Sequence, residues 1–404
     1  MPVNTDFLVI GGGIIGISIA NEILNRYPNS NVTIIEKENQ IGLHASGRNS
    51  GVLHAGFYYS EDSLKAKLTS TGNTLMTNYC IENNLPIRKC GKFVVAQNCE
   101  EEKIISMLAQ RAKNNNVKVE KISENDARKL EPNIKTSNIA LYSPNTAVVD
   151  PKSVVQSMLQ RFKEKKGKVL FNTKYLSTEN NHVVTTNGTF SYGFLINSAG
   201  LYADSIAQDF ELSEDYYLLP FKGLYIKSDK PLDFLKSNIY PVPNLRNPFL
   251  GIHFTKTISG EIKIGPTAIP AFWRENYSGL DNFQLREFFD ISSKQFSLLI
   301  NSKFDFKRIA FSELSNYYKP NILRKAEKLC KNFKKDNFQN WYVSGIRAQL
   351  VSKKNKNLVM DFIIERRENS LHILNAVSPA FTSSLSFANY VVDIMDQKDT
   401  SNWL

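Results

Sequence analysis

The stretch DFLVIGGGIIGISIANEILNRYPNSNVTIIE, residues 6–36, decides the fold of this 404-residue chain. It contains a short apolar strand, FLVI, then glycines at 11, 13 and 16 in a G-x-G-x-x-G pattern, then a helical segment and a second apolar strand, VTII. Glu36 follows directly after that second strand. A strand, glycine turn, helix and strand that end in an acid are typical of a dinucleotide-binding βαβ unit.

Each part of this unit has a mechanical task. Gly11 permits a tight turn, Gly13 lets the backbone approach a pyrophosphate, and Gly16 lets the helix lie close to the sheet. The helix N-terminus presents N–H groups to the phosphates, and Glu36 accepts hydrogen bonds from a ribose diol. A glycine-rich packing turn without a ligand is the alternative. The expected nucleotide contacts are Gly11, Gly13, Ile14, Ile15, Gly16, Glu36 and Lys37.

Length and composition limit the class of protein. With 404 residues, of which 42% are hydrophobic, the chain can bury a large core, and we expect two domains. The four cysteines form neither C-x-x-C nor another metal-ligand spacing, so we expect reduced thiols, a cytoplasmic location and no metal site. We recognise no signal peptide and no uninterrupted apolar run of about eighteen residues.

The basic charge allows two interpretations. The formal net charge is +11, and lysines gather within residues 163–168, 328–335 and 353–356. Solvated faces of a lysine-rich protein are one interpretation. Peripheral attraction to anionic lipid at the inner face of a membrane is the other, and it would suit an enzyme that passes electrons to a quinone. We expect no nucleic-acid partner, because no helix-turn-helix, zinc or RNA-recognition pattern accompanies the charge.

The rest of the chain suggests a nucleotide domain that is interrupted by an insertion. Residues 194–210 and 371–397 each show a strand that leads into a helix. Residues 215–275 contain strand-like runs separated by Gly and Pro, and residues 280–335 show helical spacing. We predict an α/β fold with a discontinuous Rossmann-like domain and an inserted β-rich α+β substrate domain. The predicted ranges are 1–75, 145–215 and 340–404 for the first, and 76–144 and 216–339 for the second.

Motifs along nearly the whole chain resemble the FAD-dependent D-amino-acid-oxidase superfamily. The early ones are GGGIIG (11–16), IIEKE (34–38), SGRNSGVLHAGFYY (46–59) and LINSAG (195–200). Later ones are similar to L-2-hydroxyglutarate dehydrogenases and oxidases, namely PFKGLY (220–225), GEIKIGPTAIPAF (260–272), GIRAQ (345–349) and NAVSPAFTSS (375–384). Two positions depart from that pattern. Arg48 stands where these proteins commonly have His, and Lys222 stands where Arg is expected.

The resemblance implies a glutathione-reductase-type FAD-binding domain and oxidation of the C2 hydroxyl of a small carboxylic acid. The substrate it favours is L-2-hydroxyglutarate, converted to 2-oxoglutarate by hydride transfer to flavin N5. The partners are then the acid and an electron acceptor, which is a quinone, oxygen or an electron-transfer protein. The FAD is covalently or non-covalently held. An amino-acid or amine oxidase of the same superfamily and a non-catalytic flavin-binding protein remain as alternatives.

Oxidation of a 2-hydroxy acid requires a base near the flavin, and histidine is the economical choice. His54 follows N-S-G-V-L, in a segment that the resemblance implies lies beside the flavin. His253 lies in GIHF of the predicted substrate domain. Either is a candidate base. Packing against the flavin is the alternative role for His54, and a hydrogen-bonded core position is the alternative for His253.

Cations are needed for the carboxylates of the substrate. Arg347 in GIRAQ is the best candidate, because a guanidinium pairs with a carboxylate through two parallel hydrogen bonds. Lys222 and Arg48 are candidates for a second cation, with Arg274 behind them. Tyr58 could donate a hydrogen bond to the substrate. For each of these residues a structural or solvent-facing role is the alternative.

Further cofactor contacts come from three separate segments. The first should line the path from the pyrophosphate to the flavin. The second forms a small turn beside the FAD. The third opens the final helix, whose positive end can stabilise negative charge on the reduced flavin, with simple helix capping as the alternative. In chain order these residues are Ser46, Arg48, Asn49, Ser50, Gly51, Ala199, Gly200, Pro379, Ala380 and Thr382.

Overall fold

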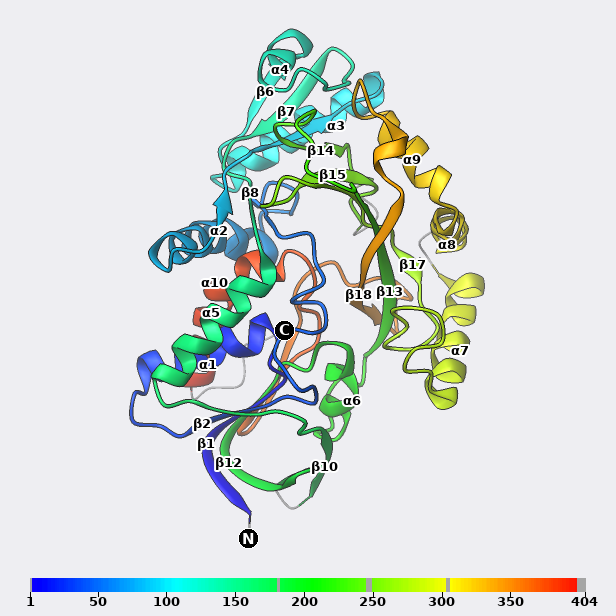
Figure 1. Cartoon of the computed structure of the whole chain (residues 1–404). Helices are drawn as coiled ribbons and strands as arrows, with labels where there is room; N and C mark the ends of the chain where they lie inside the picture. The colour runs from blue at the N-terminus through cyan, green and yellow to red at the C-terminus, as the bar shows by residue number, and fades with distance from the viewer. Residues whose placement is uncertain (1, 180–181, 245–248, 303–305, 398–404) are drawn as a thin grey trace. The chain divides into compact units, whose positions relative to one another are not determined.

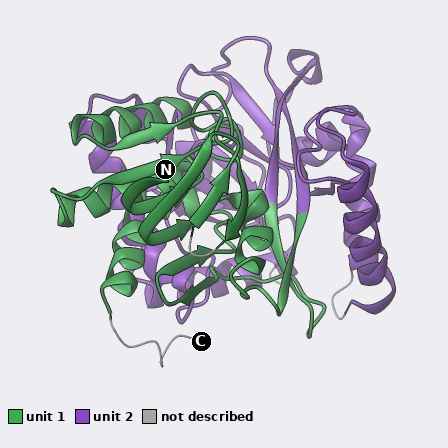
Figure 2. Cartoon of the chain, turned by 90° about the horizontal axis from the view of Figure 1, so that it is seen from below, with its two compact units in different colours: residues 1–48, 151–219, 348–404 green, residues 49–150, 220–347 purple. Residues whose placement is uncertain are grey.

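A computed structural model describes residues 2–179, 182–244, 249–302 and 306–397 (Figure 1). The chain divides into two compact units (Figure 2). Unit 1 comprises Met1–Arg48, Pro151–Leu219 and Ala348–Leu404, and unit 2 comprises Asn49–Asp150 and Pro220–Arg347. The first division falls after Arg48, earlier than the expected residue 75. The reason is local, since Val52 and Leu53 form a strand that pairs inside unit 2.

Unit 1 is built on a mainly parallel sheet that confirms the predicted α/β class. β1 pairs in parallel with both β2 and β12, β2 with β9, and β12 with β20, while β10, β11 and β19 add antiparallel edges. The strands are β1 (Val3–Ile10), β2 (Val32–Ile35), β9 (Lys168–Leu170), β10 (Tyr175–Glu179), β11 (His182–Thr185), β12 (Gly188–Asn197), β19 (Ile364–Arg367) and β20 (Ser370–Ile373).

Helix α1 packs against two other helices of unit 1. α1 contacts both α5 and α10, and the Asn21 side chain of α1 donates to the Met158 carbonyl oxygen of α5 at 3.0 Å. Ile17, Ile19 and Ile23 of α1 are buried. These elements are α1 (Ile14–Arg26), α5 (Pro151–Glu164), η1 (Gly200–Tyr202), α6 (Ala203–Gln208) and α10 (Ala380–Asp396).

Unit 2 contains a mixed sheet and a small three-stranded sheet, β3-β8-β4. The long strands β13 and β18 contain two of the four points at which the chain passes between units. Phe93, Ile239, Phe254 and Ile264 of successive strands form part of its core. The strands are β3 (Val52–Leu53), β4 (Ile87–Arg88), β5 (Lys92–Val95), β6 (Glu120–Ser123), β7 (Ile139–Ser143), β8 (Ala147–Val149), β13 (Tyr216–Lys227), β14 (Asn238–Pro241), β15 (His253–Lys256), β16 (Ile262–Gly265), β17 (Ile269–Pro270) and β18 (Asn340–Ser352).

The helices of unit 2 include the helical region predicted between residues 280 and 335. Ser63 caps α2 by accepting from the Ala66 N–H, and Asn98 caps α3 by accepting from the Glu101 N–H. Within the described ranges, no helix is long and apolar enough to cross a membrane. The elements are α2 (Leu64–Glu82), α3 (Cys99–Asn114), α4 (Glu124–Leu130), α7 (Leu285–Asn301), α8 (Phe306–Leu314), η2 (Ser315–Tyr317), α9 (Lys319–Glu327) and η3 (Lys335–Asn337).

Candidate functional site

The glycine turn of unit 1 is held too tightly for side chains at two positions. Gly11 has a φ of 99°, and a Cβ there would lie 2.8 Å from the Ser198 carbonyl oxygen. A Cβ on Gly16 would lie 2.1 Å from the Gly11 carbonyl oxygen and 2.6 Å from Ser198 Oγ. Strand β1, helix α1 and the segment after β12 therefore meet at this turn, as expected for Gly11 and Gly16.

The N-terminus of α1 is more open. A Cβ on Gly13, which precedes the helix, would meet only Ser46 Oγ, at 3.1 Å. That hydroxyl accepts the Ile14 N–H at 2.8 Å. Ile14 and Ile15 have buried side chains, so their contribution to a ligand would come from the backbone. Ser46, chosen from a separate sequence motif, thus lies at the helix end where a phosphate is expected.

Glu36 faces the same turn. Its Oε2 accepts the Gly12 N–H at 2.8 Å, and its Oε1 accepts the Glu38 N–H at 3.0 Å. The side chain is buried. Two backbone donors fix the carboxylate beside the glycine loop, and each oxygen keeps a lone pair with which a ribose hydroxyl can bond.

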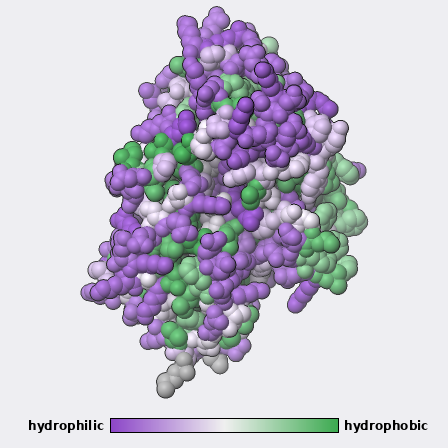
Figure 3. All heavy atoms as spheres, in the orientation of Figure 1, coloured by the Kyte–Doolittle hydropathy of each residue, from purple (hydrophilic) through white to green (hydrophobic). Residues whose placement is uncertain are grey.

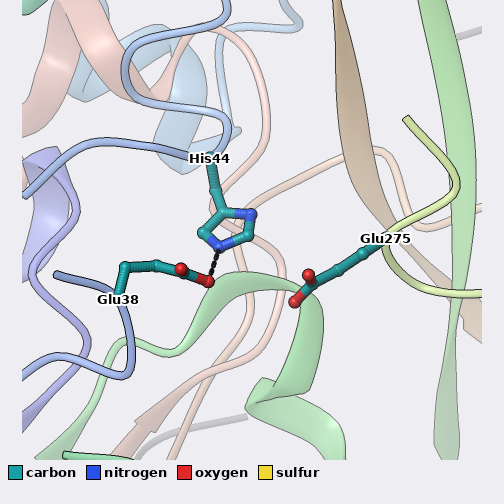
Figure 4. Close-up of side chains that lie close together, drawn as sticks. All are labelled: Glu38, His44 and Glu275. Carbon is teal, nitrogen blue, oxygen red and sulfur yellow. Dashed lines mark hydrogen bonds and ion pairs between the residues drawn. The ribbon is translucent and has the colours of Figure 1, made fainter. Parts of the chain in front are cut away.

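Lys37 and Glu38 follow Glu36 in the chain, and Figure 4 shows the Glu38 carboxylate bonded to the His44 ring. Glu38 Oε1 bonds His44 Nε2 at 2.9 Å and also pairs with the Lys37 ammonium, which lies 5.7 Å from the centroid of the Tyr202 ring. Burial opposes ionisation of Glu38, but the bonds from Lys37 and His44 leave its pKa below the usual value. Lys37 is therefore engaged with Glu38. The sequence argument did not select Glu38.

The remaining predicted cofactor residues of the early motif organise their own loop. Arg48 Nε donates to the Leu43 carbonyl oxygen at 2.6 Å. Asn49 Oδ1 accepts the Gly51 N–H at 2.8 Å, and Ser50 Oγ accepts the Val52 N–H at 3.3 Å. The Asn49 and Ser50 side chains shape the chain entering β3, so these bonds give them a local structural role.

The segment after β12 supplies a residue that sequence reasoning missed. Ser198 Oγ donates to the Ile10 carbonyl oxygen at 2.9 Å and lies 3.2 Å from that of Gly11. Ala199 follows it and packs beside Gly11. Gly200 has a φ of 55°, and a Cβ there would meet no protein atom within 4 Å. The pattern N-S-A-G already contained Ser198, but its hydroxyl was not singled out.

The start of α10 contributes the last predicted group. Pro379 is the residue before the helix, and its carbonyl oxygen accepts the Ser383 N–H at 3.1 Å. Pro379, Ala380 and Thr382 are all buried. Their place at a helix N-terminus agrees with the expected position in the sequence, and their contact with a cofactor stays a prediction.

Unit 2 brings the two candidate bases, His54 and His253, into one cluster. Asn73 of α2 donates to the carbonyl oxygens of Leu53 and His54, both at 3.1 Å, and so fixes the backbone that carries His54. His253 begins β15 and its ring stacks on that of Tyr240, with 3.6 Å between centroids. Both histidines are buried.

The environment keeps both imidazoles neutral. Burial lowers the pKa of His54 well below its usual value, with the charges of Lys92 and His253 adding to the effect. Burial lowers the pKa of His253 to about 3; its bond to the Gly251 carbonyl opposes that change and Lys92 adds to it. The sequence argument expected a base that titrates near neutrality. The structure differs because burial removes the water that would stabilise an imidazolium.

The bond of His253 also identifies its basic nitrogen. Nδ1 lies 2.8 Å from the Gly251 carbonyl oxygen. A carbonyl oxygen only accepts, so Nδ1 carries the hydrogen and Nε2 carries the lone pair.

The predicted substrate residues have different surroundings. The half-buried Arg347 guanidinium lies 5.2 Å from the centroid of the Phe249 ring, and burial lowers its pKa to about 10 while leaving it charged at neutral pH. Tyr58 is buried, and its hydroxyl has no hydrogen-bond partner among the described residues. Lys222 Nζ lies 5.9 Å from the centroid of the Tyr317 ring, and burial lowers its pKa.

Comparisons with known proteins add a family and a fold. A family model described as FAD dependent oxidoreductase matches residues 6–394. The chain is 35% identical to the L-2-hydroxyglutarate dehydrogenase of Indibacter alkaliphilus, covering 96% of this chain and 97% of that protein. It is 33% identical to the Escherichia coli K12 protein of the same name, covering 96% and 92%.

Solved structures resemble the whole chain at lower identity. The FAD-bound L-alpha-glycerophosphate oxidase of Mycoplasma pneumoniae has a TM-score of 0.77 and 21% identity, covering 99% of this chain and 97% of that one. Glycine oxidase from Geobacillus kaustophilus has a TM-score of 0.74 and 18% identity, covering 99% and 96%. At these identities the likeness concerns the fold.

Proposed function

Because this chain belongs to the DAO family of FAD-dependent oxidoreductases, we propose that it oxidises the C2 hydroxyl of a small 2-hydroxy acid, L-2-hydroxyglutarate, to the 2-oxo acid. FAD is the cofactor of the family. The residues of unit 1 fit it: the turn at Gly11 and Gly16 excludes side chains, the backbone at Gly13 stays open, and Glu36 is held beside the loop. When bound, FAD supplies the acceptor for the two electrons that leave C2 as a hydride.

The observation that carries the proposal is the pair of neutral imidazoles in unit 2. A base can take the hydroxyl proton only if it is not already protonated, and both His54 and His253 are kept neutral by burial. His253 offers Nε2. Arg347 is charged and has the planar geometry for the C1 carboxylate. In this proposal the imidazole takes the proton and Arg347 holds the acid in place.

An anaerobic substrate panel tests the proposal. L-2-Hydroxyglutarate should reduce the bound flavin and bleach its visible absorbance, while its D-enantiomer, glycine, L-proline and glycerol 3-phosphate should act at least about a hundredfold more slowly. Reduction by an amino acid and not by the hydroxy acid would instead assign the chain to amine oxidation. Failure of every compound, with an artificial acceptor present, would favour a flavoprotein without turnover.

We also propose that a cytoplasmic form of the protein contacts an anionic membrane surface through α7 and α8. Hydrophobic residues gather on the surface over these helices (Figure 3). On α7, Leu285, Phe289, Phe296 and Ile300 are each more than 60% exposed, whereas the opposite face packs inward. An exposed apolar stripe with basic neighbours is typical of helices that lie in a membrane interface. The exposed basic neighbours are Arg286, Lys307 and Arg308.

Vesicle sedimentation tests this contact. The protein should bind vesicles of phosphatidylglycerol more strongly than vesicles of phosphatidylcholine, and salt should weaken the binding. The double variant Phe289→Ser/Phe296→Ser should lose most of the binding, whereas Ile81→Ser, at an exposed apolar residue of α2, should keep it. Equal sedimentation of the two variants would contradict the proposal.

A further inference from the structure

Lys92 is a buried amine for which the described part of the chain provides no acceptor. The residue is 0% exposed, and among the described residues its Nζ has no hydrogen-bond partner. Three aromatic rings surround the amine, with centroids 4.5 Å away for Phe57, 4.4 Å for Tyr58 and 4.9 Å for Tyr240. An ammonium buried without a carboxylate is strongly unfavourable, and ring faces compensate only in part. A methionine would fill the same space without this cost, so the amine indicates a role beyond packing.

The amine lies on the same face of the unit 2 sheet as the candidate base His253. β14 pairs in parallel with β5, and Tyr240 lies opposite the residue two places after Lys92, so these two side chains project from one face. The His253 ring stacks on Tyr240, with 3.6 Å between the centroids. The alternate residues Phe93 and Ile239 point the other way, into the core. One face of the sheet is therefore apolar, and the other carries a cation beside a base.

A second cation of unit 2 lies close to the same aromatic group. Arg347 is electrostatically coupled to Tyr59. Tyr59 directly follows Tyr58, whose ring contacts the Lys92 amine. Unit 2 thus provides two cations that are connected through a pair of tyrosines, which suits an acid with a carboxylate at each end.

We propose that Lys92 binds the distal C5 carboxylate of the substrate, together with the Tyr58 hydroxyl, and thereby selects a dicarboxylic 2-hydroxy acid over a monocarboxylic one. The inference rests on the proposed function and deepens it. Arg347 holds the C1 carboxylate beside the reacting carbon, and Lys92 fixes the other end of the acid. A site with a buried ammonium rejects an acid that leaves the ammonium unpaired.

Tyr58 provides both a donor and the way in. Of the three rings around the amine, Phe57 and Tyr240 are 0% exposed, whereas 7% of Tyr58 is exposed. The carboxylate therefore reaches Lys92 past the Tyr58 ring. The Tyr58 hydroxyl has no hydrogen-bond partner among the described residues, so it can donate to the incoming oxygen.

Lys222, the second cation that the sequence suggested, has a different environment. Burial lowers the pKa of Lys222, but the charge of Asp281 opposes that change, so an acid of the protein already stabilises its charge. For Lys92, burial lowers the pKa to about 7 and no acid opposes it. A ligand carboxylate beside Lys92 would restore the charge, because an opposite charge favours the ionised form.

Equilibrium binding tests the inference without turnover. The FAD-loaded protein is titrated with 2-oxoglutarate and with 2-oxopentanoate, which differ only in the distal carboxylate, and each Kd is measured by calorimetry. The wild type should bind 2-oxoglutarate about thirtyfold or more tightly than 2-oxopentanoate. In Lys92→Met the two Kd values should lie within about threefold, with the value for 2-oxopentanoate nearly unchanged. Lys263→Met is the matched control and should keep the preference, because Lys263 is buried on β16 with its Nζ 4.7 Å from the centroid of the Tyr342 ring.

Three results would overturn the inference. The first is equal binding of the two acids by the wild type, and the second is a preference that survives in Lys92→Met. The third is an equal weakening of both acids in that variant, which would assign Lys92 to packing. If the preference is lost in Lys222→Met instead, the distal carboxylate lies at Lys222. Failure of L-2-hydroxyglutarate to reduce the flavin would count against the proposed function alone, because these Kd values do not depend on turnover.

Stability separates this role from a structural one. Lys92→Met removes an unpaired buried charge at nearly constant volume, so the Tm of the ligand-free protein should stay the same or rise. If the variant nevertheless does not fold, Tyr58→Phe decides with the same two acids. Loss of the hydroxyl should raise the Kd for 2-oxoglutarate about tenfold and leave that for 2-oxopentanoate unchanged. An equal effect of Tyr58→Phe on both acids would overturn the inference.

Discussion

His253 Nδ1 donates to the Gly251 carbonyl oxygen at 2.8 Å, while Asn73 binds the backbone of His54. The two imidazoles are thus held in place by different contacts. His253 is oriented through its ring, with Nε2 left basic, and His54 is positioned through its main chain. Sequence reasoning selected both residues and left the choice between them open.

Replacing each histidine by glutamine should show which one is the base. Loss of a general base slows proton transfer by about 10² to 10⁴. We expect a decrease of that size in the anaerobic rate of flavin reduction for one of His54→Gln and His253→Gln, and a smaller decrease for the other. His182→Gln, on β11 of unit 1, is the control. Nearly unchanged rates in both cluster variants would point to an amine substrate that enters neutral.

Replacing Arg347 by lysine should weaken binding of the acid. The ammonium keeps the positive charge but loses the two parallel donors of the guanidinium, so we expect the Kd for L-2-hydroxyglutarate to rise by about ten- to a hundredfold. The comparison variant is Lys222→Arg, which restores the residue type expected from the resemblance. An unchanged Kd in Arg347→Lys would remove Arg347 from the substrate site.

Residues whose partners come from distant strands were the ones that the sequence did not reveal. Lys92 was not among the predicted site residues, and its aromatic neighbour Tyr240 lies on β14, which pairs in parallel with β5. The only local signal was a lysine at the head of an apolar strand. By contrast, Gly11, Gly16 and Glu36 were predictable, since a strand, turn, helix and strand that are contiguous in sequence determine their geometry.

At the scale of elements, two glycines near the start of α1 should have different roles. Gly16 should matter for folding, and Gly13 should matter for binding FAD. Gly16→Ala would place a methyl group 2.1 Å from the Gly11 carbonyl oxygen, whereas Gly13→Ala would meet only Ser46 Oγ at 3.1 Å. We expect Gly16→Ala to lower the Tm of the FAD-free protein. Gly13→Ala should leave that Tm nearly unchanged but raise the Kd for FAD by about tenfold or more, because the backbone there approaches the pyrophosphate. Identical effects of the two variants on Tm and Kd would contradict this division.

The order of the elements was largely predictable, and the divisions between units were less so. Alternating runs indicated the strands between residues 215 and 275, and apolar positions that recur at three and four indicated the helices between 280 and 335, since the periodicity of a segment is local. The two-residue strand β3 pairs with β8, far along the chain, and so draws Asn49 onwards into unit 2. So short a strand has too few residues to show a pattern.

At the scale of the whole molecule, buried histidines should make the fold sensitive to acid. Burial lowers the pKa of His54 and takes those of His253 and His372 to about 3. As pH falls below 6.5, the unfolded chain binds protons that the native chain does not, so stability is lost. Each such histidine contributes about 1.4 kcal/mol per pH unit.

Urea unfolding at pH 6.5 and pH 5 measures this effect. The free energy of unfolding should be clearly lower at pH 5, and His372→Gln should remove one of the three contributions. His372 lies in unit 1, with Nδ1 3.1 Å from Asn197 Nδ2, so this test is independent of the proposed base. Equal stability at the two pH values would show that the native state accepts these protons.

The most direct test of the central claim is a single-turnover measurement. Purified FAD-loaded protein is mixed anaerobically with L-2-hydroxyglutarate, and both the flavin absorbance and the product are followed. The account predicts that the flavin bleaches and that about one 2-oxoglutarate forms for each FAD reduced. Folded protein that does not bind FAD, or bound FAD that stays oxidised in the presence of this acid, would contradict it.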